Sequence, residues 1–556
     1  MNLSLQVCST SSKIVSMMEL VIVFVLVTGL SAYFSVLDPD LHHDGFMLKT
    51  ATDVASGDTL FKDTFTQYGA FTVWTQSAAI SLFGTKLVVL RLFTAGCYGL
   101  IACIFFGIQK KVLPKLLAIL SMAVLVSLAP FYVMPLLPWS SVYALLFLLL
   151  GIYSFLVGLK TKKLYLILIS GAAFACCFWY RQPTGIVLIT TYLYFIVTYW
   201  DTRTPRVLTF KRFFAFSGGA VAVNILVVTL LIVAGSLGDW WKQSILGPYL
   251  WVNSFGDESL SFMDIMTHLV APNLVWAGVG SVSYIWTVYP TVTVIWGIIV
   301  ITKILKQRAL NLKEHYVLII VLASIGSWHQ YYPLTDMRHV YWASAPMMGL
   351  LVLSLSCLTT KLRCGKLLSV AMTTIVLVGF FWEELEYRFR EGSNRIERIA
   401  LGTSNLEGMF LTKPYFKALG REGTIQEYSM EITQIANFLK NVREYDETIQ
   451  LVNLTYDMYS LTELHGKNYH KVYLSWPWAG MLYPDHDVAL RTYILKNRPL
   501  LEVPKNSFWS DEGHPIRAKF GVSNYYVVAE SNYGLDGTIQ ILAPQEFMEN
   551  YLPTYM

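Results

Sequence analysis

The chain has 556 residues, of which 54% are hydrophobic and 14% are charged, and its formal net charge at pH 7 is +5. Soluble proteins carry about 25% charged residues, so the composition excludes an ordinary soluble enzyme and indicates an integral membrane protein. The small net charge gives no reason to expect a nucleic-acid partner.

The seven cysteines form no structural pattern. Six lie in or beside apolar spans, none follows Cys364, and no spacing matches a disulfide framework or a zinc site. The polar C-terminal region is therefore expected to fold on its hydrophobic core alone.

Eleven apolar spans come close to the length of about 20 residues that a transmembrane helix needs. The first is long and lacks a signal-peptide cleavage site, so we interpret it as a membrane anchor. The expected spans are residues 17–37, 86–108, 116–136, 140–158, 164–181, 184–200, 213–234, 281–302, 316–333, 339–359 and 367–382.

The loops between the spans predict the orientation. Under the eleven-span arrangement, five groups of Lys and Arg fall on one side of the membrane, at residues 110–115, 160–163, 203–212, 303–313 and 361–366. Because basic loops stay in the cytoplasm, we expect a cytoplasmic amino terminus and an extracytoplasmic C-terminal domain. A bacterial inner membrane fits this arrangement, and an endoplasmic reticulum membrane is left open.

The first outer loop, residues 38–85, is the most polar part of the membrane half. Two short helices, at residues 46–54 and 71–83, are expected to lie at the interface within it. Its acidic residues are Asp38, Asp40, Asp44, Asp53, Asp58 and Asp63.

After the last span the composition changes. Residues 383–401 are highly charged and are expected to form a linker helix, which leaves residues 1–382 as the transmembrane domain. Residues 402–556 alternate helical and strand patterns, which predicts a layered α/β domain. The expected elements are helices at 427–442 and 488–496 and strands at 448–454, 471–475, 500–503 and 525–529. An N-glycosylation pattern begins at Asn453, inside an expected strand.

Asp44 is the main candidate for chemistry in the outer loop. It stands in the sequence HHDG, a few residues beyond the first span, where a partly desolvated carboxylate can act as a general base. The alternative is a solvated acid that caps the following helix. The polar residues clustered around Asp44 favour the catalytic interpretation.

His42 and His43 precede this carboxylate. They are candidates for hydrogen bonds to Asp44 or to a substrate, and for metal ligation together with Asp44 or Asp40. Adjacent histidines point in different directions on a regular backbone, so joint ligation is not expected. No cofactor is predicted, and a divalent metal is left open.

Two further polar clusters are expected at the same outer face. Arg181, at the outer end of the fifth span, either pairs with an anion in a cavity or extends to the lipid headgroups. The turn at residues 327–346 contains Asp336, Arg338 and His339 among many aromatic residues, and its Arg338 and His339 are candidates to hold a phosphate. This convergence predicts an active site for a substrate with an apolar tail and an anionic head.

These motifs resemble those of the GT-C glycosyltransferases that use polyprenyl-phosphate sugars, especially the protein O-mannosyltransferases and the aminoarabinose transferase of lipid A. HHDG resembles the acidic motif that begins the first outer loop of the family. The pattern G-D-x-L-F-K-D-x-F-x-Q-Y-G at 57–69 is similar to the loop that follows, and P-x-x-D-x-R-H at 333–339 is similar to a late motif. The resemblance covers most of the membrane half.

The resemblance implies a polytopic α-helical membrane protein with a GT-C-like fold. It also implies inverting transfer of a sugar from a polyprenyl-phosphate donor to a hydroxyl of a protein, lipid or glycan acceptor at the extracytoplasmic face. Asp44 would take the acceptor proton, and Arg181, with Arg338 or His339, would stabilise the departing phosphate. The candidate substrate contacts are His42, His43, Lys62, Gln67, Tyr68 and Asp336.

The chain departs from the family pattern at two places. Many relatives carry a second acidic residue where this chain has Gly45. The aminoarabinose branch has a Lys-Pro-Pro run where this chain has Gln67-Tyr68-Gly69, so no phosphate-binding lysine is transferred to that point. Either Lys62 or Lys86 substitutes for it, or Arg181 acts alone.

Two other functions fit less well. A transporter or flippase is expected to place charges near mid-membrane and often has inverted repeats, whereas the spans here are almost free of charge, Arg91 excepted, and show no repeat. A membrane-anchored scaffold needs only one span. We therefore favour glycosyl transfer, with hexosyl and pentosyl donors both left open.

Overall fold

A computed structural model of the chain describes residues 3–254, 284–331, 337–361, 366–402, 405–420, 423–455, 482–483, 485–505, 520–522, 524–534 and 537–551. Contacts divide the chain into two compact units. The first comprises Met1–Phe34, Thr94–Thr229 and Glu258–Gly392. The second comprises Ser35–Phe93, Leu230–Asp257 and Ser393–Met556, so the outer loop belongs to the same unit as the C-terminal region.

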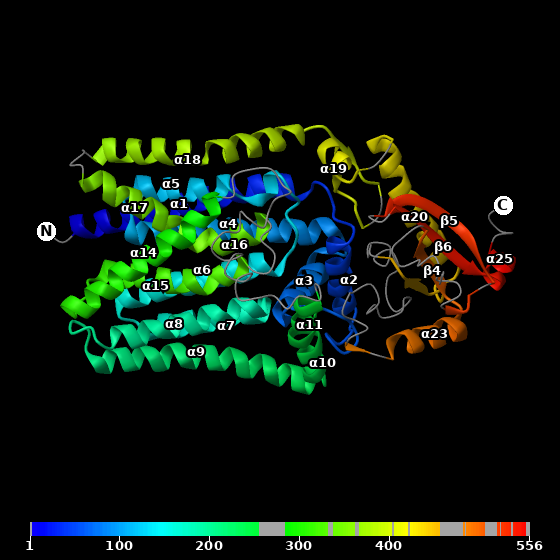
Figure 1. Cartoon of the computed structure of the whole chain (residues 1–556), viewed down its shortest axis with the longest axis horizontal. Helices are drawn as coiled ribbons and strands as arrows, with labels where there is room; N and C mark the ends of the chain where they lie inside the picture. The colour runs from blue at the N-terminus through cyan, green and yellow to red at the C-terminus, as the bar shows by residue number, and fades with distance from the viewer. Residues whose placement is uncertain are drawn as a thin grey trace. The chain divides into compact units, whose positions relative to one another are not determined.

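Each of the eleven expected spans falls on a helix (Figure 1). The helices are α1 (Leu3–Ser35), α4 (Leu87–Val112), α5 (Lys115–Ser127), α6 (Ser140–Thr161), α7 (Leu164–Tyr180), α8 (Ile186–Thr198), α9 (Arg206–Val233), α14 (Tyr284–Gln307), α15 (Leu312–Trp328), α16 (Met337–Ser344) with α17 (Met348–Lys361), and α18 (Lys366–Asn394). Among the described residues, seven helical segments are long and apolar enough to cross a membrane. The chain is therefore an integral membrane protein, and the span number of eleven stays a prediction.

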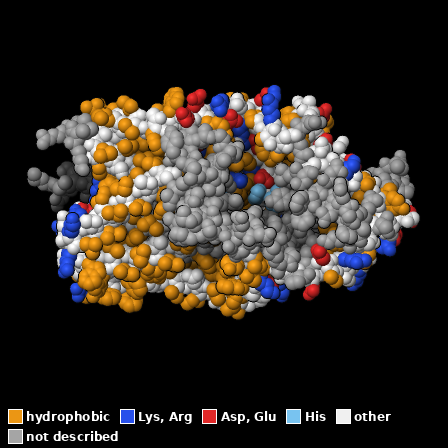
Figure 2. All heavy atoms as spheres, viewed as in Figure 1, with side chains coloured by type: hydrophobic (Ala, Val, Ile, Leu, Met, Phe, Trp, Pro, Cys, Tyr) orange, Lys and Arg blue, Asp and Glu red, His pale blue; other side chains and the backbone are white. Residues whose placement is uncertain are grey.

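Large apolar side chains are exposed along these helices. On α9 alone, Val221, Ile225 and Leu230 are exposed. Figure 2 shows hydrophobic side chains over much of the helical part of the molecule. Because a contiguous apolar surface is unfavourable in water, this surface is suited to lipid hydrocarbon.

Two glycines let α7 and α9 approach each other closely. A Cβ atom added to Gly171 would lie 1.9 Å from the carbonyl oxygen of Phe216. A Cβ atom added to Gly219 would lie 1.9 Å from the carbonyl oxygen of Leu168. Small residues at a helix interface are typical of membrane proteins, where helices associate through close packing.

The outer loop contains the two short helices that the sequence predicts. They are α2 (His43–Ala55) and α3 (Ala70–Phe83). Gly84, at a φ of +100°, follows α3 in a conformation that favours glycine. Further along the chain, α10 (Leu237–Trp241), the π-helix η3 (Lys242–Leu246) and α11 (Gly247–Ser254) belong to the same unit. Gln243 of η3 ties this segment to the outer loop, since its Nε2 donates to the carbonyl oxygen of Phe61 at 2.7 Å.

The charged segment after the last span is helical, but it is not a separate helix. It continues α18 as far as Asn394. After it come β1 (Arg398–Ala400), β2 (Phe410–Thr412) and α19 (Lys413–Ala418), which the sequence analysis did not predict.

The C-terminal region forms the expected α/β arrangement. The predicted helices appear as α20 (Ile425–Tyr445) and α23 (His486–Asn497), and three predicted strands appear as β3 (Leu451–Asn453), β4 (Leu500–Pro504) and β5 (Tyr525–Gly534). The structure adds β6 (Gly537–Pro544) and α25 (Gln545–Tyr551). The strand expected at 471–475 lies outside the described residues.

The last four strands of the described chain form one mixed sheet in the order β3-β4-β6-β5. The pair β3 and β4 is parallel, and the other two pairs are antiparallel. Leu490 and Ile494 of α23 pack with Val452 and Leu501 of the sheet in a hydrophobic core. Asn453 is buried in β3 and donates through Nδ2 to Glu502 Oε2 at 2.9 Å, so its glycosylation pattern is inaccessible in the folded chain.

Candidate active site

Asp44 lies in the first turn of α2, because this helix begins three residues earlier than the sequence predicts. Its side chain is 2% exposed and faces Arg91 of α4, which is fully buried. Arg91 Nε lies 3.0 Å from Asp44 Oδ1, and Arg91 Nη2 also donates to Asp44 Oδ2. The backbone N–H of Asp40 donates to the same Oδ2 at 2.8 Å. Asp44 is therefore a buried partner of an arginine and not a solvated cap.

This environment acts on the Asp44 carboxylate in two opposing ways. Burial raises its pKa above the usual value for aspartate, and the charge and hydrogen bonds of Arg91 partly offset the rise. Among the described residues Oδ1 has a single hydrogen-bond partner, Arg91, and a carboxylate oxygen can accept two. Oδ1 therefore keeps one acceptor position that no described residue uses.

Arg91 also holds the backbone that leads into α2. Its Nη1 donates to the carbonyl oxygen of Ser35 at 3.2 Å, and its Nη2 donates to the carbonyl oxygen of Asp38 at 3.3 Å. In the sequence, Arg91 is visible only as a charge within an apolar span. A charged residue within an apolar span indicates a functional role and a charged partner. The local sequence pattern does not identify that partner as Asp44, which lies 47 positions away.

Asp38 forms a second buried ion pair. Its Oδ2 accepts from Arg395 Nε at 3.0 Å, and its Oδ1 accepts from the backbone N–H of Thr412 at 2.7 Å. The backbone N–H of Asp38 donates to the carbonyl oxygen of Phe410 at 2.7 Å. These bonds hold Asp38 at a φ of +54°, a conformation that is unfavourable for a residue other than glycine.

The other acidic residues of the loop have local roles. Asp40 accepts from the backbone N–H groups of His42 and His43 and contacts His43 Nδ1 at 2.9 Å. Burial would raise the pKa of Asp40, but His43 outweighs it and holds that pKa below its usual value. Asp63 accepts from the backbone N–H of Thr59 at 3.0 Å, as a turn residue does.

The rings of His42 and His43 lie against each other, edge to face. Their ring centroids lie 4.8 Å apart and the ring planes are 80° apart. Within the described ranges, no three His, Cys, Asp or Glu side chains come together in a group that could hold a metal ion. His42 is buried and His43 is partly buried.

The remaining candidate contacts of the outer loop differ in their exposure. Lys62 is exposed, whereas Gln67 and Tyr68 are partly buried. The Tyr68 carbonyl oxygen accepts from Ser244 Oγ at 3.1 Å. Lys86, a possible substitute for the missing lysine, forms an exposed ion pair with Glu407. Asp336 lies outside the described residues.

A second cluster lies in the first unit, where the predicted phosphate-binding residues converge on the start of α6. Arg181 follows α7 and donates through Nη1 to Ser141 Oγ. The guanidinium carbon of Arg338 lies 4.2 Å from the ring centroid of Trp139, and the ring of His339 lies 5.6 Å from the same ring. The fold therefore brings residues from α6, α7 and α16 together.

The start of α6 adds features that suit an anion. The amino terminus of a helix presents unpaired N–H groups and a positive partial charge, which attract phosphate. Ser140 in the first turn is fully buried, and its Oγ has no hydrogen-bond partner in the described part of the chain. Trp139, Ser140 and Ser141 were not predicted as site residues, although serines at the start of an apolar span are a helix-start signal.

A search of solved structures gives the fold. ArnT from Cupriavidus metallidurans bound to undecaprenyl phosphate matches with a TM-score of 0.53 and 11% identity, over 94% of this chain and 97% of that chain. The apo form of the same ArnT matches with a TM-score of 0.49 and 13% identity, over 94% and 97% of the two chains. Oligosaccharyltransferase AglB from Archaeoglobus fulgidus, in complex with an inhibitory peptide and a dolichol-phosphate, matches with a TM-score of 0.49 and 12% identity, over 88% of this chain and 69% of that chain. Neither the family models nor the curated protein sequences gave a match.

The match to the undecaprenyl-phosphate-bound ArnT extends over nearly the whole of both chains. It confirms the predicted fold class, a GT-C-like helical membrane protein with a C-terminal α/β region. The resemblance to the GT-C glycosyltransferases is thus confirmed at the level of the fold. At 11% identity the match shows the fold alone.

The Asp38–Arg395 pair yields a prediction on stability. Removing one partner of a buried ion pair leaves an uncompensated charge and costs about 3–5 kcal/mol. We expect Arg395→Ala to lower the thermal unfolding midpoint of the purified chain clearly. The matched control is Arg398→Ala, an exposed arginine three residues later, which should have little effect. Equal midpoints for the two variants would contradict the structural role of Arg395.

Proposed function

We propose that this protein is an inverting glycosyltransferase that moves a sugar from a polyprenyl-phosphate donor to an acceptor hydroxyl. The observation that carries the proposal is the Asp44 carboxylate, which is buried, oriented by Arg91, and still able to accept a hydrogen bond through Oδ1. The fold shared with ArnT, solved with bound undecaprenyl phosphate, supports the donor class.

The proposed reaction needs one base. The acceptor hydroxyl donates to Asp44 Oδ1 and gives up its proton as its oxygen attacks the anomeric carbon of the sugar. The bond between that carbon and the phosphate oxygen breaks, and the polyprenyl phosphate leaves with the electron pair. Burial raises the pKa of Asp44 and makes it a stronger base than an exposed aspartate, while Arg91 favours its ionised form.

The departing phosphate needs positive charge. We assign this role to Arg181, Arg338 and His339 together with the amino terminus of α6, because fixed cations and aligned N–H groups stabilise charge that develops on a leaving group. The apolar side chains on the helix surfaces suit the polyprenyl tail. The proposal covers hexosyl and pentosyl donors and protein, lipid or glycan acceptors alike.

The placement in the membrane is part of the proposal. We assign residues 1–382 to the transmembrane catalytic domain and residues 402–556 to a soluble extracytoplasmic domain. Residues 383–401, most of which continue α18, connect the two. The basic loops support a cytoplasmic amino terminus, and a bacterial inner membrane is the proposed location.

The base is tested with Asp44→Asn, since an amide of the same shape cannot take the proton. We expect the rate of sugar transfer to fall at least about 100-fold, within the range of general-base catalysis. Transfer is measured as release of polyprenyl phosphate from a panel of polyprenyl-phosphate sugars by purified protein. Asp58→Asn in the same loop is the matched control. Full activity of a folded Asp44→Asn variant would remove Asp44 as the base.

The ion pair predicts a shift of the pH profile. Asp44 must be ionised to act, so activity falls as the pH drops through its pKa. Replacing Arg91 with Gln removes the charge that lowers this pKa, so the acidic limb of kcat/KM should move to higher pH. Arg91→Lys keeps the charge and should shift the limb less. An acidic limb at the same pH in all three proteins would contradict the coupling.

The phosphate site is tested with Arg181→Ala. Loss of a cation that contacts the donor phosphate should raise the KM for the donor and lower kcat. Arg206→Ala is the matched control, because Arg206 lies at the start of α9 within a basic loop. Unchanged donor affinity and turnover in Arg181→Ala would exclude Arg181 from the site.

The orientation is tested by cysteine labelling at Lys62 and Lys313, which are both exposed. In a chain without its native cysteines, a membrane-impermeant maleimide added to intact cells should label Lys62→Cys and not Lys313→Cys. Labelling of both positions from the same side would overturn the proposed topology.

A further inference from the structure

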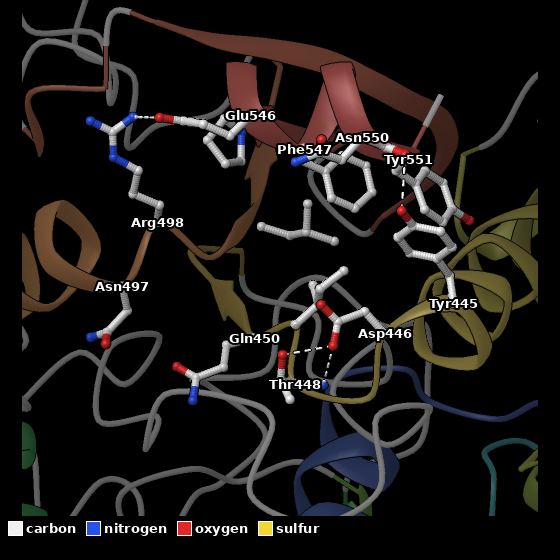
Figure 3. A pocket seen from close by; sticks show the side chains of 13 residues that line it. Tyr445, Asp446, Thr448, Gln450, Asn497, Arg498, Glu546, Phe547, Asn550 and Tyr551 are labelled. Atoms are coloured by element: carbon white, nitrogen blue, oxygen red, sulfur yellow. Dashed lines mark hydrogen bonds and ion pairs between the residues drawn. The ribbon is translucent and has the colours of Figure 1, made fainter. Parts of the chain in front are cut away.

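The C-terminal domain contains a pocket that the proposed reaction does not use. It has a volume of about 560 Å³ and lies among the end of α20, the turn that follows, the end of α23, and α25 (Figure 3). All its lining residues belong to the second unit. The volume is within the range of about 300–1,000 Å³ that is typical of small-molecule sites.

One side of the pocket is aromatic. Phe547 and Tyr551 stack with ring centroids 4.5 Å apart, and the Tyr445 ring meets Tyr551 edge to face at 4.9 Å. The Tyr445 hydroxyl donates to the carbonyl oxygen of Asn550 at 2.9 Å. Tyr445 is nevertheless 43% exposed. The protein thus holds an aromatic ring in a fixed orientation while leaving much of its surface open.

The opposite side carries planar polar groups, with Asn497 and Gln450 at the left of Figure 3 and the aromatic rings at the right. Gln450 Oε1 is buried and has no hydrogen-bond partner within the described ranges. Asn497 uses its Nδ2 on the carbonyl oxygen of Tyr493 at 3.0 Å, which leaves its Oδ1 as an acceptor. Amide side chains in this arrangement suit a ligand that both donates and accepts hydrogen bonds.

The charges of the pocket argue against an anionic ligand. Its one arginine, Arg498, is paired with Glu546, and a second carboxylate, Asp446, remains. Asp446 Oδ1 already accepts from the backbone N–H of Thr448 at 2.8 Å and from its Oγ1 at 2.6 Å. A phosphate or carboxylate ligand would therefore meet no uncompensated positive side chain among the residues that line the pocket.

We propose that this pocket is a binding site for a neutral carbohydrate. A sugar ring has an apolar C–H face that packs on an aromatic ring, here Tyr445. Its hydroxyls donate and accept at the rim of the ring, where Gln450, Asn497 and Asp446 offer complementary groups. The inference goes beyond the proposed function and does not depend on it, because binding requires no transfer.

Binding is tested by saturation-transfer NMR on the full-length chain in lipid nanodiscs, with mannotriose, maltotriose and galactotriose as probes. We expect at least one trisaccharide to bind and Gln450→Leu and Tyr445→Ala to weaken its affinity at least tenfold. Tyr445→Phe keeps the ring and should stay within about threefold of the wild type. Gln434→Leu, at an exposed position of α20, is the matched control and should bind like the wild type.

Three results would overturn the proposal. They are the absence of binding for all three trisaccharides, unchanged affinity in both Gln450→Leu and Tyr445→Ala, and displacement of the bound sugar by inorganic phosphate. Asp44→Asn is expected to bind the sugar with wild-type affinity, and a loss of binding there would also place the site elsewhere. If the chain binds the sugar but has no transfer activity, the proposed function is refuted, and the assignment of this pocket as a sugar-binding site still stands.

Discussion

The ion pair between Asp44 and Arg91 is the interaction on which the position of the candidate base depends. Taking a carboxylate and a guanidinium out of water costs several kcal/mol for each ion, and only good geometry with further hydrogen bonds offsets that cost. Arg91 meets this condition, because it also donates to the carbonyl oxygens of Ser35 and Asp38. One buried side chain therefore orients the candidate base and holds the chain that leads to it.

Asp38 extends this arrangement to a distant part of the sequence. Its partner Arg395 lies 357 positions further on, directly after α18, and Thr412 of β2 adds two hydrogen bonds to the same carboxylate. The outer loop and the start of the C-terminal region are thus held by one buried pair. A catalytic carboxylate needs such fixed support, since transfer depends on the position of the base relative to the reacting hydroxyl.

Local sequence patterns predicted most of the helices and strands. They could not predict contacts between residues that are far apart in the sequence. Hydropathy placed a helix at each expected span, and the helical spacing in residues 427–442 predicted α20, which also begins with a capping box formed by Thr424 and Glu427. The strand β6 was missed, although Ile539 and Ile541 alternate with a polar residue as strands do. Asp44 was singled out by its motif, whereas its partner Arg91 was visible only as an isolated charge. The cluster at the start of α6 and the C-terminal pocket each bring together residues from several segments. The periodicity of the sequence does not predict which distant segments lie close together.

The central claim is that Asp44 and Arg91 act in sugar transfer as one unit. The most direct measurement is a double-mutant cycle of kcat/KM for transfer from a polyprenyl-phosphate sugar, with Asp44→Asn, Arg91→Gln and the double variant. If Arg91 acts through the Asp44 carboxylate, Arg91→Gln lowers the rate in the wild-type background and has little further effect once Asp44 is an amide. Rate losses that simply multiply in the double variant would contradict the claim, because two residues that act independently give additive free energies.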